Sequence, residues 1–274
     1  MAKQASNVSE IDILKINTGR TEIHIIGTMP LILQRLPEKA WRELLLPKGR
    51  KGAAERASSL KHDPYAEFRS APYIDRDPNG PTLLQHLASA FKAAMCGAAL
   101  DIPGATKSQL GRLTWVVGER ISIYGVPQIF STIVRSADMN HTPDVRTRVI
   151  VPRWAAKFDV AYVQPNLRVA SVANLIAAAG LTQGLGDWRP QKGKGTYGQY
   201  AVTMPEDKAF LEILKTGGRA AQVAAMANPV AYDEDTEELL RWYMDEAKQR
   251  GFEPTAAGAN GAGKKRGTAP TVEA

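Results

Sequence analysis

The chain has 274 residues, of which 44% are hydrophobic and 23% charged, a balance that excludes disordered and fibrous classes of protein. Its formal net charge of +7 at pH 7 favours anionic partners such as nucleic acid or an anionic membrane surface. Apolar runs stay below the roughly 18 residues that span a bilayer, and the N-terminus lacks a secretory signal. One cysteine, Cys96, excludes an intramolecular disulfide and fits a reducing cytoplasm. Together with the short apolar runs, this leads us to expect a cytoplasmic protein without a membrane partner.

The first third of the chain alternates between ordered and irregular segments. Residues 1–19 are polar and predict a flexible N-terminus, and β-branched residues predict a strand over 21–29. Two prolines bound a predicted helix at 37–47, and a basic loop rich in glycine and serine follows at 48–63. Residues 65–81 predict a short hairpin or irregular β segment that closes in an Asp-Pro-Asn-Gly turn.

The clearest helix signal covers residues 82–100. Its apolar residues recur at spacings of three and four and form one face, made by Leu84, Leu87, Phe91, Met95 and Ala98. The following segments are rich in β-branched residues and predict strands at 120–125, 128–137, 145–152 and 157–165.

A second amphipathic helix is predicted over 169–181, and a strand over 199–204. The segment between them, "GLGDWRPQKGKGTYGQY" (184–200), combines glycines, cations and aromatic residues. Residues 206–252 predict C-terminal helices, the second with acids in its first turn and bases in its last. Residues 253–274 are predicted to be a disordered tail.

Without its inserts, this order is strand, helix, strand, strand, helix, strand. The pattern predicts an α+β fold of the ferredoxin-like (βαββαβ) type over 20–205, with two helices covering one face of an antiparallel sheet. An unrelated α+β sandwich fits the same order. The second face of the ferredoxin-like sheet is then available to a ligand.

Enzymatic chemistry has little support in the sequence. The four histidines are scattered and no zinc motif or activated-serine motif is present. The stretch "GKGT" lacks the spacing of a phosphate-binding P-loop. We therefore expect a protein that is not an enzyme and that uses no catalytic residue, metal or cofactor.

Two basic segments are candidates for contact with phosphates. The first is the loop that contains Lys48, Arg50 and Lys51, for which a solvated surface loop is the alternative. The second is the strand at 145–152, where Arg146 and Arg148 share one face because side chains alternate along a strand. Arg153 and Trp154 follow directly; a strand with a merely polar outer face is the alternative here.

The glycine-rich segment is the third candidate. Its planar and cationic side chains suit stacking on bases and contact with phosphates, and the members expected to bind are Trp188, Arg189, Lys192, Lys194 and Tyr197. Alternatively, Trp188 anchors the loop to the core and the glycines serve turns.

Short segments of the chain resemble a known superfamily. "IHIIGTMPLIL" (23–33) and "TLLQHLASAFKAAMCGAA" (82–99) resemble the first strand and helix of the repeat-associated (RAMP) superfamily, which includes backbone subunits of CRISPR effector complexes. "GLGDWRP" followed by "GTYGQYAV" is similar to its glycine-rich element and to early proteins of tailed phages. The resemblance implies a ferredoxin-like (RRM-like) core that binds single-stranded nucleic acid, encoded by a phage or mobile element and located in a bacterial host cell.

These observations predict a non-enzymatic protein that coats single-stranded DNA or RNA as a homo-oligomer. One alternative is an assembly protein whose loops and C-terminal helices bind neighbouring copies, since Trp, Tyr and Arg are also enriched in protein interfaces. A second is a RAMP-like endoribonuclease, which would need a general-base histidine near an arginine pair.

Overall fold

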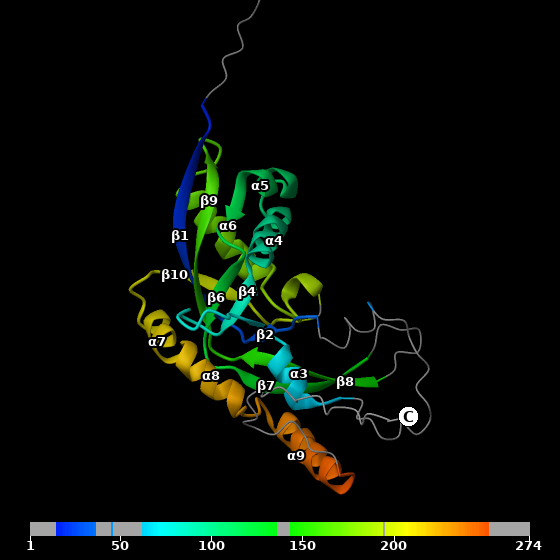
Figure 1. Ribbon diagram of the computed structural model, residues 1–274. Helices are drawn as coiled ribbons and strands as arrows, with labels where there is room; N and C mark the ends of the chain where they lie inside the picture. Colours follow the sequence, from blue (N-terminus) through cyan, green and yellow to red (C-terminus); the bar gives the residue numbers. More distant parts are fainter. Residues whose placement is uncertain (1–14, 37–44, 46–61, 136–142, 194, 252–274) are drawn as a thin grey trace, which may run out of the picture.

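The computed structural model describes residues 15–36, 45, 62–135, 143–193 and 195–251 (Figure 1). Its main feature is a seven-stranded antiparallel sheet with the order β10-β1-β9-β6-β4-β3, in which β5 also pairs with β9. These strands are β1 (Asn17–Gly27), β3 (Tyr73–Ile74), β4 (Leu84–Leu87), β5 (Thr114–Val116), β6 (Arg120–Tyr124), β9 (Ala155–Gln164) and β10 (Tyr200–Thr203).

The long pair of β1 and β9 forms the middle of this sheet, in register from Asn17 opposite Gln164 to Ile26 opposite Ala155. Side chains alternate between its two faces, so Ile23 and Ile25 are buried and lie on the core side. The chain is therefore α+β with an antiparallel sheet, as its residue patterns predict.

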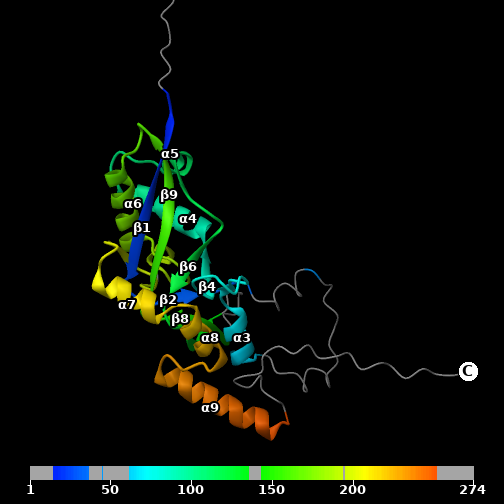
Figure 2. The same ribbon diagram turned by 60° about the vertical axis from the view of Figure 1, so that its left-hand side comes forward.

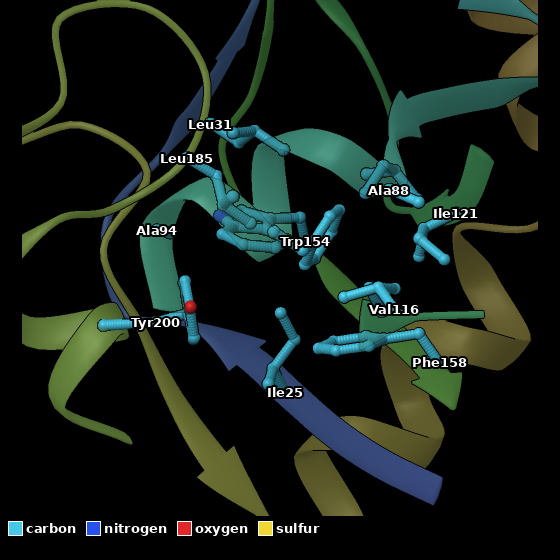
Figure 3. Close-up of a cluster of buried hydrophobic side chains, with 14 of the residues drawn as sticks. Ile25, Leu31, Ala88, Ala94, Val116, Ile121, Trp154, Phe158, Leu185 and Tyr200 are labelled. Carbon is cyan, nitrogen blue, oxygen red and sulfur yellow. The ribbon is translucent and has the colours of Figure 1, made fainter. Parts of the chain in front are cut away.

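Two helices cover the core face of the sheet. The helix α4 (Ala88–Ala98) buries Phe91 and Met95, and α6 (Val169–Thr182) buries Val172 and Ile176. The short elements η1 (Ala99–Asp101) and α5 (Lys107–Leu113) follow α4. Figure 3 shows the resulting apolar cluster, which joins side chains from the helices, the sheet and the glycine-rich segment.

A smaller sheet has the order β2-β8-β7 and lies beside the main one in Figure 1. Its strands are β2 (Leu31–Leu33), β7 (Gln128–Arg135) and β8 (Pro143–Val151). The helix α3 (Pro64–Ser70) packs on β8 and buries Phe68 in the common core. The strand β2 pairs only with Val149–Val151 of β8. Along the N-terminal half of that edge, Glu67 of α3 accepts a hydrogen bond from the Thr147 amide.

Three helices complete the described chain: α7 (Lys208–Thr216), α8 (Arg219–Ala227) and α9 (Glu234–Gln249). Figures 1 and 2 show them in succession along one side of the molecule. Phe210 and Ile213 of α7 pack on Tyr124 and Ala155, on the sheet face opposite α4 and α6. Part of that second face is therefore covered by the chain itself, and α9 packs against β7.

Several elements differ from the sequence prediction. Residues 64–70 form the helix α3 rather than β structure, capped by the Asp63 carboxylate, which accepts hydrogen bonds from two α3 amides. The helix predicted from residue 82 begins at Ala88, because Leu84–Leu87 pair with β3 and β6 as a strand. The strand β1 begins at Asn17, inside the segment expected to be flexible. The predicted helix at 37–47, the basic residues 48–61 and the tail 253–274 lie outside the described residues, apart from Leu45.

None of the helices in the described ranges combines the length and the apolar character that crossing a membrane requires.

Candidate nucleic-acid interface

The glycine-rich segment folds back onto β2 and the residue before it. Asp187 donates its backbone N–H to the Ile32 carbonyl at 3.0 Å, and Gly198 donates to Pro30 at 2.8 Å. Leu185 donates to Gly198 at 2.9 Å, which closes the segment on itself. Gly198 has a φ of 71°, and a Cβ at this position would collide with the Leu185 carbonyl. The segment is thus a packed structure rather than a simple connection.

This packing brings the glycine-rich segment over β8. The Arg148 guanidinium lies 4.7 Å from the centre of the Trp188 ring, and its Nε is 3.1 Å from the Asp187 carboxylate. Only 6% of the Arg148 side chain is exposed. Burial lowers the pKa of Arg148, while the nearby Asp187 carboxylate opposes that shift. Arg148 was predicted to line a groove; it instead lies beneath Trp188 and joins the segment to the sheet.

Trp188 belongs to a cluster of four aromatic rings. Phe130 of β7 lies 6.0 Å from Trp188, 6.4 Å from Tyr197 and 5.5 Å from Tyr232, measured between ring centres. Phe130 is buried, whereas Trp188, Tyr197 and Tyr232 are half-buried. Such rings keep part of their surface available for a ligand and are held in place by their neighbours.

The end of the basic loop is fixed at the other end of β8. His62, the first described residue after 46–61, lies 2.9 Å from the Asp144 carboxylate through Nε2 and 2.6 Å from Glu67 through Nδ1. The second oxygen of Glu67 accepts the Thr147 amide at 3.3 Å, at the edge of β8 that β2 leaves open. The hydrogen bond with Glu67 is the largest cause of a raised pKa at His62, and burial opposes it. Loop and strand are therefore joined by a charged contact.

Replacing His62 with glutamine should reduce the dependence of stability on pH. Because the folded-state pKa of His62 is raised above 6.5, its ion pairs contribute fully below the ordinary value and are lost as pH rises through the raised one. The free energy of unfolding of the natural protein should therefore fall over that interval, and His62→Gln should remove this fall. Urea unfolding from pH 5.5 to 9 measures it; equal slopes in both proteins would contradict the assignment.

Three of the predicted cations keep part of their side chains exposed. Arg146, on the same side of β8 as Arg148, is 49% exposed and 3.8 Å from Asp144. Lys192 is exposed in η2 (Pro190–Lys192). Arg189 is half-buried and donates to the Gly186 carbonyl at 2.7 Å and to Gln191 at 2.9 Å.

Two predicted residues lie elsewhere. Trp154 is fully buried, and its indole N–H donates to the Met29 carbonyl at 2.9 Å, so its ring cannot stack on a base. Figure 3 shows it in the centre of the apolar cluster. Arg153 is exposed and pairs with Glu212 of α7 at 3.2 Å, away from the aromatic cluster. The predicted residues Lys48, Arg50, Lys51 and Lys194 lie outside the described residues.

The structure adds residues that the sequence did not single out. Phe130 and Tyr232 support the aromatic cluster, Asp187 neutralises Arg148, and His62 anchors the basic loop. The sequence could have indicated His62, because it borders a basic run. No feature of the sequence around Tyr232 indicates that it belongs to the site. Among the described residues, no group of three or more His, Cys, Asp or Glu side chains is arranged to hold a metal ion.

Comparison with known proteins finds a weak structural similarity. No family model matches the chain, and no curated protein matches it. Among solved structures, it is similar to a chain of the Type III-B Cmr-beta complex bound to cognate target RNA, with 12% identity and a TM-score of 0.37. The match covers 68% of this chain and 59% of that chain. At this TM-score the similarity assigns neither a fold family nor a function.

Proposed function

We propose that this chain is a non-enzymatic protein that binds single-stranded DNA or RNA and covers it as an oligomer. The proposal rests on one observation: β8, one of the three basic segments that the sequence singles out, contacts the other two. His62 holds the end of the basic loop at Asp144, Arg146 is exposed in the middle, and Arg148 holds Trp188 of the glycine-rich segment.

The chemistry of this junction suits a single strand better than a duplex. The half-buried rings of Trp188, Tyr197 and Tyr232 offer planar surfaces, and stacking on a base contributes about 1–3 kcal/mol for any base. Bases within a duplex are not available for such stacking. Arg146 of β8 and Lys192 of the glycine-rich segment supply exposed positive charge for phosphates.

We assign the core to the ferredoxin-like type as part of the same proposal. Four strands of the main sheet follow the order β10-β1-β9-β6, with α4 between β1 and β6 and α6 between β9 and β10. This order supports a βαββαβ unit, to which β2, β7 and β8 are additions. The proposed interface then lies on the added sheet, whereas α7 covers part of the second face of the main sheet.

Removing the two exposed cations should weaken binding of single strands. We expect Arg146→Ala/Lys192→Ala to lower affinity for a labelled single-stranded oligonucleotide about tenfold at low salt, since each cation would neutralise one phosphate. Fluorescence anisotropy of the nuclease-treated protein with single-stranded DNA, single-stranded RNA and duplex measures this. Lys107→Ala/Lys208→Ala removes equal charge from α5 and α7 and should leave affinity nearly unchanged. Equal losses in both variants, or preference for duplex, would overturn the proposal.

Cleavage of RNA is a second candidate function because of the position of His62. An endoribonuclease would need a histidine near Arg146 and Arg148. Both ring nitrogens of His62 are engaged by carboxylates, and its pKa is raised. Without a free nitrogen it is a poor general base. Incubation with labelled RNA distinguishes the two functions: intact RNA is expected, and discrete products abolished by His62→Gln would establish the nuclease.

A further inference from the structure

A groove of about 570 Å³ lies between the outer edge of β7 and the first half of α9. Its lining combines apolar and acidic side chains from both elements, among them Ile133, Asp235, Glu238, Leu239 and Trp242. Ile133 is 74% exposed and Trp242 is 65% exposed, which is unusual for two large apolar side chains beside one groove.

The backbone of β7 is open at the same place. Earlier in the strand, Ile129 bonds with Val230 and Tyr232, and Ser131 bonds with the Thr236 hydroxyl in both directions. Ile133 is next in this alternating series, and the described part of the chain supplies no such partner for it. An unpaired strand edge accepts an extended peptide through main-chain hydrogen bonds.

The charge of the groove selects the kind of peptide. Asp233, Asp235 and Glu238 line it, and its lining includes no basic side chain. Of these, Asp233 caps α9 by accepting the Thr236 amide at 2.8 Å, so Asp235 and Glu238 remain to attract a cation. An extended segment with adjacent lysine or arginine residues fits these features.

We propose that the groove binds the C-terminal segment of the same chain through Lys264, Lys265 and Arg266. Along α9, Asp235 lies 16 residues before Gly251, which at a rise of about 1.5 Å per residue is about 24 Å. The 12 residues from 252 to 263 span up to about 40 Å when extended, so the basic cluster reaches the groove of its own chain. The cluster is the one concentration of positive charge after residue 252.

Zero-length carbodiimide cross-linking of the full chain, followed by mass spectrometry, tests this. We expect Lys264 or Lys265 to be joined to Asp235 or Glu238, in yields that fall as ionic strength rises. Mixing unlabelled with ¹⁵N-labelled protein identifies the donor, because a link within one chain joins peptides of a single isotope. Links between isotopes would make a second copy the occupant and overturn the proposal, as would the absence of links to these acids.

Charge exchange separates a contact from a general effect on folding. Lys264→Glu/Lys265→Glu should abolish the cross-links, and combining it with Asp235→Lys/Glu238→Lys should restore them with reversed charge. Arg241 and Arg250 already pair with Glu237 and Glu246 on α9, so the exchange leaves those pairs intact. Failure of the combined variant to regain cross-links, in protein with natural circular dichroism, would contradict the contact.

Discussion

Replacing Trp154 with alanine should lower the free energy of unfolding by about 3–5 kcal/mol, the range observed when a large buried aromatic side chain is truncated. The Trp154 ring is fully buried among apolar side chains from both sheets and packs edge-on at 6.1 Å from Tyr200. The substitution also leaves the Met29 carbonyl without the indole N–H that it now accepts. Urea denaturation measures the change.

A matched control separates this loss from a general sensitivity to truncation. Leu181, at the exposed side of α6, should cost no more than about 0.5 kcal/mol when replaced by alanine. If Trp154→Ala were equally mild, and if it weakened nucleic-acid binding, the ring would be a surface contact, as the sequence alone suggested. We expect instead that folded Trp154→Ala protein keeps its affinity for single strands.

Replacing Gln222 with leucine should cost about 2–4 kcal/mol, because a buried side-chain amide then leaves several backbone groups unpaired. Gln222 is fully buried in α8. The two N–H groups of its Nε2 are shared among the carbonyls of Ile123, Gly125 and Gly217, and its Oε1 accepts from the amides of Leu83 and Leu84. One side chain thus ties α8 to β4, β6 and the end of α7.

The control for Gln222→Leu is the same substitution at an exposed glutamine. Gln191→Leu should change stability by less than about 0.5 kcal/mol, since Gln191 lies in η2 at the surface. Thermal unfolding of both variants tests the difference. A loss below about 1 kcal/mol in Gln222→Leu would mean that the hydrogen bonds to these five backbone groups are replaced or are not formed.

The main strands and the two core helices could be predicted because their patterns are local. In β1, Ile23 and Ile25 alternate with polar residues, and in α6, Val172 and Ile176 recur at the spacing of one helical face. These patterns reflect burial on one side of each element, which neighbouring residues encode.

Other elements depend on distant partners. Leu84 and Leu87 fit the helical spacing of α4, yet they lie in a strand because β6 pairs with Gln85–Leu87 across the sheet. The helix α8 is alanine-rich and was not predicted, and the buried Gln222 gives no signal in the sequence for its five partners. Pairings over such separations decide the structure after local preference is satisfied.

The candidate site follows the same division. Alternation along β8 correctly places Arg146 and Arg148 on one side, but only the fold shows that Trp188 and Asp187 cover Arg148 and leave Arg146 exposed. The sequence places Trp154 at the interface because it follows Arg146, Arg148 and Arg153, whereas the structure buries it in the core. Proximity in sequence identified the cations and misplaced one aromatic residue.

The salt dependence of single-strand binding tests the proposed interface most directly. The logarithm of the binding constant falls with that of the salt concentration, by about 0.7 per neutralised phosphate for a single strand. Arg146→Ala/Lys192→Ala should therefore reduce the slope by about 1.4, while Lys107→Ala/Lys208→Ala leaves it unchanged. If the slope of the Arg146/Lys192 variant equals that of the natural protein, these cations do not contact phosphates and β8 is not the nucleic-acid interface.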